Sequence, residues 1–216
     1  MIHDFYDRNN ELIPQKESIE QVIEALIAVF KAGGKLLLCG NGGSAADCEH
    51  IAGELLKGFL KRRAVTETDK KLLEKAACEL QMPDSGNRLG NNLQRGLPVI
   101  SLVNMISVSS AFANDVDPNL TFAQLVYVLG NPGDAVLLIS TSGNSESILQ
   151  AAVTAKAKNV LTIGLTGRTG GMLAEITDHS IHTPSDETYR IQEYHLPVYH
   201  YICAKLEQEF FDDDGK

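Results

Sequence analysis

The stretch Lys35-Leu36-Leu37-Leu38-Cys39-Gly40-Asn41-Gly42-Gly43-Ser44 decides how this chain folds. Its first part, 35–39, is a short apolar run of the length expected for one buried strand, and a glycine-rich turn follows directly. Ser44 opens a segment with helical spacing, which we expect to continue to about Lys61. A strand, a tight turn and a helix in immediate succession are typical of a βαβ unit, the building block of parallel sheets.

The same alternation of apolar strands and helices recurs through the rest of the chain. Further strands are predicted at 98–103, 135–140, 160–165 and 179–183, and helices at 17–32, 107–113, 121–129 and 145–158. Repeated units of this kind predict an α/β fold with a parallel sheet that is covered on both faces. We therefore expect a three-layer sandwich, Rossmann-like or flavodoxin-like, in which about five strands lie between helices.

Two segments depart from this alternation. Residues 66–92 interrupt it with a charged amphipathic helix at 68–80, followed by a stretch at 83–92 that reads as a loop because it is rich in Gly and Asn. We interpret 66–92 as a surface insertion, so that residues 1–216 form a single domain. The last helical pattern, 187–211, contains Pro197, which we expect to kink or divide the helix.

The composition of the chain argues against several classes of function. The chain has 216 residues and a formal net charge of −9, which disfavours binding to nucleic acid or to anionic membranes. No apolar run is long enough to cross a bilayer, and the first ten residues contain no apolar signal segment. The four cysteines lack metal-type spacing, which indicates a reducing compartment. We therefore expect a cytoplasmic protein with neither a nucleic-acid nor a membrane partner.

The turn at 40–45 satisfies a loose G-x-G-x-x-A pattern, so a dinucleotide site has to be considered. A dinucleotide site also needs an acidic residue at the end of a second strand, about 20 residues further on, to bind the ribose. The sequence has no such residue in that place. We therefore expect no nucleotide cofactor and a smaller ligand at this turn.

A second turn, Ser140-Thr141-Ser142-Gly143-Asn144-Ser145, follows the strand predicted at 135–140 and leads into a helix. Hydroxyl groups and free N–H groups at a helix N-terminus form a site for a dianionic phosphate. A serine-rich N-cap would need only one of the four hydroxyls. Because no GK[ST] sequence is present, this is not a nucleotide P-loop. The turn predicts a site for the phosphate group of a small molecule.

Two pairs of polar residues have helical spacing. His50 and Glu54 are four residues apart and should lie on one face of the first predicted βαβ helix. Gln192 and His200 are eight residues apart, which places them within roughly a quarter-turn of each other. Spacing alone leaves open whether these residues form a joint functional site or are solvated surface residues.

Together, these motifs resemble the phosphoheptose isomerases of the sugar isomerase (SIS) superfamily. The resemblance rests on the 40–44 turn, His50-x-x-x-Glu54-Leu55, the 140–145 turn, Arg190-Ile191-Gln192-Glu193 and His200, which occur in the family's order. It implies a SIS domain and an aldose–ketose isomerase of sugar phosphates. The implied reaction interconverts sedoheptulose 7-phosphate and D-glycero-D-manno-heptose 7-phosphate. Such a reaction moves a proton between neighbouring carbons, which a carboxylate and an imidazole on opposing helices can do.

The resemblance also implies a role for each matching residue. Glu54 corresponds to the catalytic base and His200 to its acid/base partner. The implied substrate-binding residues are Asn41, Gly42, Gly43, Asn114, Asp115, Ser140, Thr141, Ser142, Ser145 and Gln192. The implied ligands of one zinc ion per subunit are His50, Glu54, Gln192 and His200. The family further implies a homotetramer with active sites at subunit interfaces.

Two other functions stay open, and one departure from the family is visible. A non-catalytic relative in the superfamily binds a replication-initiator protein, and a sugar-phosphate sensor would need only the 140–145 turn. The presence of both Glu54 and His200 favours the enzyme. Phosphoheptose isomerases usually carry a Gly-Arg pair shortly after the catalytic Glu, whereas this chain reads Lys57-Gly58-Phe59. An arginine contact is therefore missing or is supplied by Lys57, Arg62 or Arg63.

Overall fold

A computed structural model describes residues 2–211 of the chain. The N-terminal segment forms a short helix α1 (Phe5–Arg8), a 3-10 segment η1 (Asn10–Gln15) and the long helix α2 (Lys16–Lys31). Apolar residues three and four positions apart give α2 one buried face. Gly33, with φ of +81°, then takes a left-handed conformation that ends the helix.

Five parallel strands form one sheet in the order β2-β1-β3-β4-β5. The strands are β1 (Leu36–Gly40), β2 (Val99–Ser101), β3 (Ala135–Ser140), β4 (Leu161–Thr166) and β5 (His179–His182). This order is the flavodoxin-like one, so the predicted α/β fold is confirmed. The chain direction across the sheet reverses between β1 and β3, and in such sheets ligands bind beyond the carboxyl ends of the strands at this switch point.

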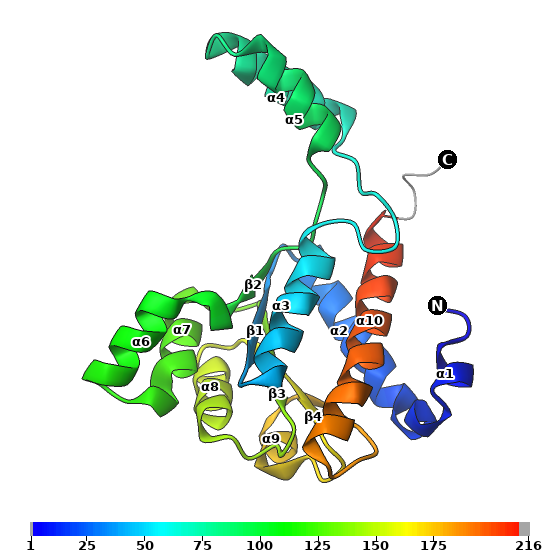
Figure 1. Cartoon of the computed structure of the whole chain (residues 1–216), viewed down its shortest axis with the longest axis vertical. Helices are drawn as coiled ribbons and strands as arrows, with labels where there is room; N and C mark the ends of the chain where they lie inside the picture. The colour runs from blue at the N-terminus through cyan, green and yellow to red at the C-terminus, as the bar shows by residue number, and fades with distance from the viewer. Residues whose placement is uncertain (1, 212–216) are drawn as a thin grey trace.

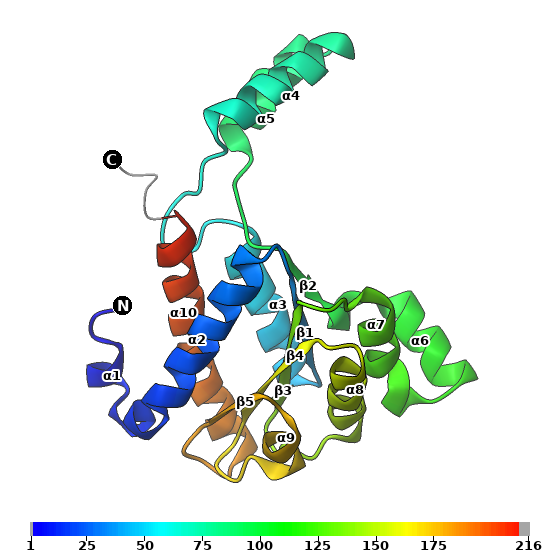
Figure 2. The same ribbon diagram turned by 180° about the vertical axis from the view of Figure 1, so that it is seen from behind.

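Helices cover both faces of the sheet, as Figures 1 and 2 show. On one face lie α2, α3 (Gly43–Leu56) and α10 (Thr188–Phe211). On the other face lie α7 (Thr121–Leu129), α8 (Glu146–Ala157) and α9 (Gly171–Ile176), of which α9 was not predicted. Alternate residues of β1 face the two layers: Leu36 and Leu38 join the first core, and Leu37 joins the second. The predicted three-layer sandwich is therefore confirmed.

The remaining segments lie around β2. The 3-10 segment η2 (Leu102–Asn104) follows β2, and α6 (Ile106–Asp115) and η3 (Pro118–Leu120) then lead to α7. Figure 1 shows α6 at the outer side of the molecule, beyond α7, and none of its residues is buried. Among the helices of residues 2–211, none combines the length and the apolar character that a membrane span requires.

The predicted continuation of α3 to Lys61 is wrong, because the helix ends at Leu56. Arg63, which is fully buried, donates hydrogen bonds to the carbonyl oxygens of Glu54 (2.9 Å) and Leu55 (2.7 Å). In a continuing helix those carbonyls would accept from the N–H groups of residues 58 and 59. The N–H of Phe59 donates instead to the Glu207 carboxylate of α10, at 2.9 Å. A buried side chain thus replaces the next helical turn.

The segment 66–92 forms a helical hairpin of α4 (Glu67–Glu79) and α5 (Pro83–Asn92), which projects away from the sheet in Figure 1. The predicted loop at 83–92 is therefore wrong. The two helices pack so closely that a Cβ at Gly86 would lie 2.7 Å from the Cα of Glu74. The glycines that suggested a loop are needed for this close packing. An isolated antiparallel bridge between Ala64 and Gln94 joins the two ends of the insertion.

The predicted division of the last helix at Pro197 is also wrong, because α10 runs unbroken from Thr188 to Phe211. Proline removes the hydrogen bond to the carbonyl four residues earlier, which here belongs to the exposed Glu193. Solvent can hydrate that carbonyl, so the missing bond leaves no buried polar group. α10 packs against α2 and α3, and such tertiary packing supplies most of the stability of a helix.

Candidate active site

The turns that follow β1 and β3 meet at the switch point of the sheet. The side-chain amide of Asn41 donates to Ser145 Oγ at 3.0 Å and to Ser147 Oγ at 2.9 Å. On the other side of the turn, a Cβ at Gly43 would overlap the side-chain amide of Gln192 on α10. Glycine at position 43 therefore lets Gln192 lie against the first turn of α3. The structure thus brings together predicted substrate-binding residues from three separate motifs.

The loop after β3 has a fixed shape. Gly143 has a φ of +66° and packs against the backbone of Gly170, where a Cβ would overlap. The N–H of Asn144 donates to Ser142 Oγ at 3.1 Å, and Asn144 Oδ1 accepts from the N–H of Met172 at 3.0 Å. Ser145 is the N-cap residue of α8, but its hydroxyl binds Asn41 and makes no cap hydrogen bond. This leaves N–H groups of the first turn of α8 without a side-chain cap, as a phosphate site requires.

A cavity of about 320 Å³ lies beside these turns. Its polar wall includes three hydroxyl residues that sequence reasoning missed, Ser109, Thr121 and Ser147. Of the three, only Ser147 could have been predicted from the sequence, because it lies two residues after Ser145 of the hydroxyl-rich turn. The lining residues are Gly40, Asn41, Gly42, Ala45, Val103, Ser109, Ala113, Pro118, Thr121, Phe122 and Ser147.

The structure places the predicted pair Asn114 and Asp115 outside the lining of this cavity. Both residues are exposed at the C-terminal end of α6, where the Asn114 amide donates to Asp115 Oδ1 at 2.8 Å. Their neighbour Ala113 does line the cavity. The pair therefore directly follows a lining residue without lining the cavity itself.

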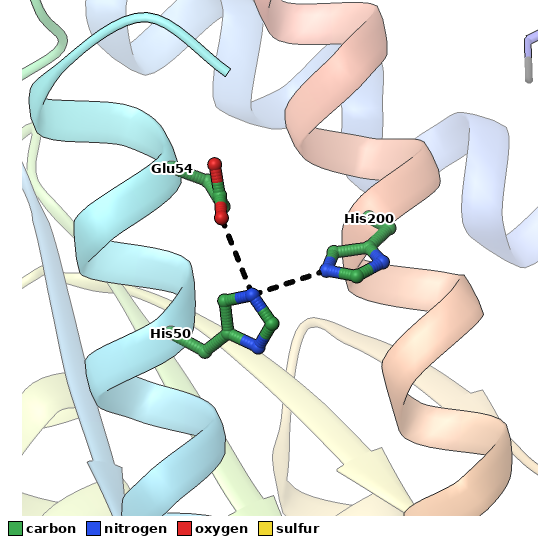
Figure 3. A group of neighbouring side chains, drawn as sticks. All are labelled: His50, Glu54 and His200. Carbon is green, nitrogen blue, oxygen red and sulfur yellow. Dashed lines mark hydrogen bonds and ion pairs between the residues drawn. The ribbon is translucent and has the colours of Figure 1, made fainter. Parts of the chain in front are cut away.

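A second group of polar side chains lies between α3 and α10, as Figure 3 shows. His50 Nε2 is 3.2 Å from Glu54 Oε1 and 3.3 Å from His200 Nε2. One ligand atom from each of the three residues lies within 4.8 Å of the other two. The Glu54 side chain is only 15% exposed, whereas that of His50 is 42% exposed. We call these three residues the His–Glu–His group.

The surroundings of His200 favour its neutral form. Burial lowers the pKa of His200, the nearby His50 lowers it further, and Glu54 partly offsets both effects. An imidazole whose pKa lies below the usual value of 6.5 is mostly neutral at pH 7. A neutral imidazole can exchange a proton with a substrate or offer a lone pair to a metal ion.

Gln192 lies apart from this group, although the family resemblance implied that it is a fourth ligand. Its side chain contacts Gly43 in the first turn of α3, whereas His50 and Glu54 lie in the second half of that helix. A helix rises about 10 Å over the seven residues from Gly43 to His50. Zinc ligands lie about 2.0–2.3 Å from the ion. His50, Glu54 and His200 therefore lie together, whereas the fourth predicted zinc ligand, Gln192, lies beside the turn after β1.

The structure also distinguishes the three cations that could replace the missing arginine. Arg63 is buried and paired with Glu207 at 2.8 Å, so it cannot reach a ligand. Arg62 donates to the carbonyl oxygen of Asn91 in the hairpin. Lys57 Nζ lies 4.0 Å from Glu54 Oε2 and its side chain is exposed. Of the three, Lys57 is the one beside the His–Glu–His group.

Comparisons with known proteins agree with this fold. Residues 7–99 and 104–200 each match a family model described as SIS domain. This chain is therefore a SIS-domain protein.

Closer relatives identify the family. The phosphoheptose isomerase of Roseiflexus sp. is 37% identical over 199 residues, which cover 92% of this chain and 85% of the relative. That of Aneurinibacillus thermoaerophilus is 38% identical over 193 residues, covering 89% and 82%. The structure of the phosphoheptose isomerase from Neisseria gonorrhoeae has a TM-score of 0.72 at 27% identity, covering 95% of this chain and 94% of that one. This chain belongs to the phosphoheptose isomerase family, which confirms the predicted resemblance.

Proposed function

We propose that this protein is a phosphoheptose isomerase that interconverts sedoheptulose 7-phosphate and D-glycero-D-manno-heptose 7-phosphate. The observation that carries the proposal is the His–Glu–His group, in which α3 and α10 bring Glu54 and His200 to the same place. Family membership supports the same reaction. A non-catalytic scaffold or a sugar-phosphate sensor would have no use for a carboxylate and a neutral imidazole so arranged.

The residues of this group divide the proton transfers between them. His50 contacts Glu54 Oε1, which leaves Oε2 as the carboxylate oxygen that takes the proton from the carbon beside the carbonyl. The same carboxyl group returns that proton to the neighbouring carbon. His200 exchanges a proton with the substrate oxygens, so that an enediol forms and collapses without a free alkoxide. The lowered pKa of His200 favours the neutral imidazole, which can accept the proton of a substrate hydroxyl.

The His–Glu–His group also fits a zinc ion. Two imidazoles and one carboxylate form a ligand set of catalytic zinc sites, which keep a fourth position open. We infer that His50, Glu54 and His200 hold the ion. Gln192, the proposed fourth ligand, lies beside Gly43 in its own chain, so in this proposal it comes from a neighbouring subunit. A bound zinc ion would polarise the carbonyl oxygen of the substrate.

The phosphate end of the substrate is proposed to bind at Ser140, Thr141, Ser142 and Ser145, with the sugar chain at 41–43. In one chain these residues lie near the start of α3, whereas Glu54 lies eleven residues beyond Gly43, or about 16 Å along the helix. A homotetramer with active sites at subunit interfaces would bring the two parts together. Exposed apolar side chains on and after α6, Ile106 (75% exposed) and Val116 (62%), support such an interface.

We also infer a cytoplasmic location. All four cysteines are free, and three of them, Cys39, Cys48 and Cys203, are buried. Unpaired thiols are typical of proteins in a reducing compartment.

Turnover of sedoheptulose 7-phosphate by the purified protein tests the proposal. The assay is run as purified, with added zinc and with a chelator. Formation of the aldoheptose phosphate would support the isomerase, and loss of turnover with chelator would support the zinc site. A folded protein that gives no product under any of the three conditions would contradict the proposal.

A further inference from the structure

The α4–α5 hairpin buries very little between its two helices. Within α4 and α5 only Ala77, Gly86 and Gly90 are buried, so the contact between the helices is made of small residues. Such residues bury little apolar surface, and apolar burial is the main source of packing stability. α5 also contains two glycines and three asparagines, which are residue types of low helix propensity. Helices of 13 and 10 residues are marginal in water without tertiary packing, which indicates that a further surface covers this hairpin.

The apolar residues of α4 lie on one flank of its contact with α5. Glu74 and Ala77 face α5, because a Cβ at Gly86 would lie 2.7 Å from the Cα of Glu74 and 3.2 Å from the Cβ of Ala77. At about 100° per residue, the rest of α4 divides into two flanks beside this line. The apolar flank consists of Leu72, Leu73, Ala76 and Leu80. The polar flank consists of Lys71, Lys75 and Cys78. Leu72 is 60% exposed and Leu80 is 73% exposed, so the apolar flank is uncovered.

α5 is divided in the same way, and its apolar flank lies on the same side of the hairpin. Gly86 and Gly90 face α4, and the exposed side chains of Met82, Leu89 and Leu93 lie to one flank. The other flank carries Asn87 and Asn91. A turn of three residues joins the helices, so they run antiparallel. In both helices the apolar flank comes one residue before the contact positions, and in antiparallel right-handed helices these two flanks lie on one side. We call this two-helix apolar surface the hairpin face.

The charges of the hairpin favour a second copy of the chain as the partner of this face. Residues 66–92 contain four basic and five acidic side chains, a formal charge of −1, whereas the whole chain carries −9. Two copies therefore repel each other least where their hairpins meet. Both α4 and α5 carry both signs of charge, so identical hairpins can pair opposite charges around the face. Nucleic acid or an anionic membrane would require an excess of basic residues, which this segment lacks.

We propose that the hairpin face docks on the hairpin face of a second copy of this chain, so that the two hairpins form a four-helix bundle. Such a contact uses the same surface on both subunits, as two-fold symmetry requires. The hairpin projects from the sheet in both views, which leaves its face accessible to another molecule (Figures 1 and 2). The pairing is separate from the α6 surface described above and does not depend on the isomerase function.

A pair of charges placed in the hairpin face tests the proposal. Leu80→Lys combined with Leu89→Lys puts one lysine on each side of the face, at positions that are already exposed. Size-exclusion chromatography with light scattering gives the molar mass of the full chain over a range of concentrations. We expect the native protein to have twice the molar mass of this variant. Equal masses at every concentration would overturn the proposal.

The control variant places the same charges on the polar flanks. Cys78→Lys combined with Asn87→Lys also adds one lysine near each helix, and both positions are exposed. This variant should keep the native molar mass. A loss of mass equal to that of the Leu80→Lys, Leu89→Lys variant would show that added charge alone separates the subunits, and it would overturn the role of the hairpin face.

Cross-linking gives a second readout that does not depend on the variants above. A Cys78→Ser background removes the exposed cysteine, and Cys39, Cys48 and Cys203 are buried. In this background, Ala76→Cys on the hairpin face should link two chains with a short bismaleimide, whereas Lys75→Cys on the polar flank should not. No link at position 76, or equal links at both positions, would overturn the proposal. Ile106→Lys on α6 should leave the link unchanged, and its loss would assign the association to α6 instead.

Discussion

Asn41 and Ser145 are 104 residues apart in the sequence, and their side chains are joined by a hydrogen bond of 3.0 Å. The bond connects the turn after β1 to the loop after β3. These two segments meet at the switch point, where the chain direction across the sheet reverses. Asn41 also donates to Ser147 at 2.9 Å, so one amide holds two hydroxyls of the α8 N-terminus. The shape of the proposed phosphate site therefore depends on a residue of the other turn.

Asn41→Ala should weaken substrate binding by releasing both serines. Two neutral hydrogen bonds contribute about 1 kcal/mol each, so we expect KM to rise by about tenfold or more with a smaller change in kcat. Steady-state kinetics with the heptose phosphate measure both constants. Asn92→Ala, on the projecting hairpin, is the control and should leave both constants as they are. An unchanged KM in Asn41→Ala would remove this residue from the binding site.

Glu54→Gln should abolish the proton transfer and leave phosphate-dependent binding largely intact. A positioned general base contributes roughly 10²- to 10⁴-fold, and an amide cannot take its place. Turnover assays and calorimetric titration with the sugar phosphate separate the two effects. Glu24→Gln, at an exposed position of α2, controls for the loss of one negative charge. Loss of binding together with turnover would show that Glu54 is structural.

Arg63→Met should destabilise the protein strongly. The substitution leaves the Glu207 carboxylate buried without its cation, which typically costs about 3–5 kcal/mol. It also removes the donors to the carbonyls of Glu54 and Leu55 that end α3. Urea unfolding measures the loss. Arg168→Met breaks the exposed pair with Asp186 and should cost no more than about 1 kcal/mol. Equal losses in the two variants would contradict the importance of the buried pair.

Stability should fall as the pH falls below about 6.5, in part because of His182. Burial lowers the pKa of His182 in the folded protein below its value of 6.5 in an unfolded chain. The unfolded state therefore binds more protons in this range, and the contribution of His182 is complete above about pH 6.5 and lost as the pH falls through the folded pKa. His182→Gln should flatten this slope in unfolding experiments between about pH 5 and 7.5. His200, which shifts in the same direction, accounts for part of the slope that remains. A variant with the native slope would show that His182 is not involved.

Excision of the α4–α5 hairpin tests whether 66–92 is a surface insertion in a single domain. Ala64 and Gln94 are bridge partners, so a short Gly-Ser linker can join the chain at the base of the hairpin. We expect the shortened protein to fold, with a free energy of unfolding within about 1 kcal/mol of the native value, because loop length affects stability weakly. Circular dichroism shows whether the shortened protein folds, and urea unfolding measures its free energy of unfolding. Failure to fold would show that the hairpin is part of the domain.

The sequence alone predicts the features that depend on residues close together along the chain. The run 36–39 is apolar throughout, and the glycines on either side leave a buried strand as its simplest structure. The spacing of His50 and Glu54 likewise places both on one face, because helical period alone determines it. The two hydroxyl- and glycine-rich turns follow directly from strands, and parallel strands bring their carboxyl ends to one edge of the sheet.

Long-range contacts decide the features that the sequence does not reveal. Glycine at position 86 suggests a loop when only the composition is considered. In the structure Gly86 lies in α5, where its lack of a side chain lets the helix pack closely on Glu74 of α4. The end of α3 depends on Arg63 and Glu207, which are 144 residues apart. The position of Gln192 depends on its contact with Gly43, which no spacing on α10 encodes.

The sheet order has a consequence for how the chain is made and folds. The inner strand β1 pairs with the central strand β3, and the partner of Leu36 is Ala135, 99 residues later. During synthesis, the edge of β1 that pairs with β3 stays uncovered until β3 has left the ribosome. Pairing at such sequence separation is slow, because the intervening chain must first be brought together. Refolding from denaturant should therefore be slow and sensitive to protein concentration, since an uncovered β1 can also pair with another molecule.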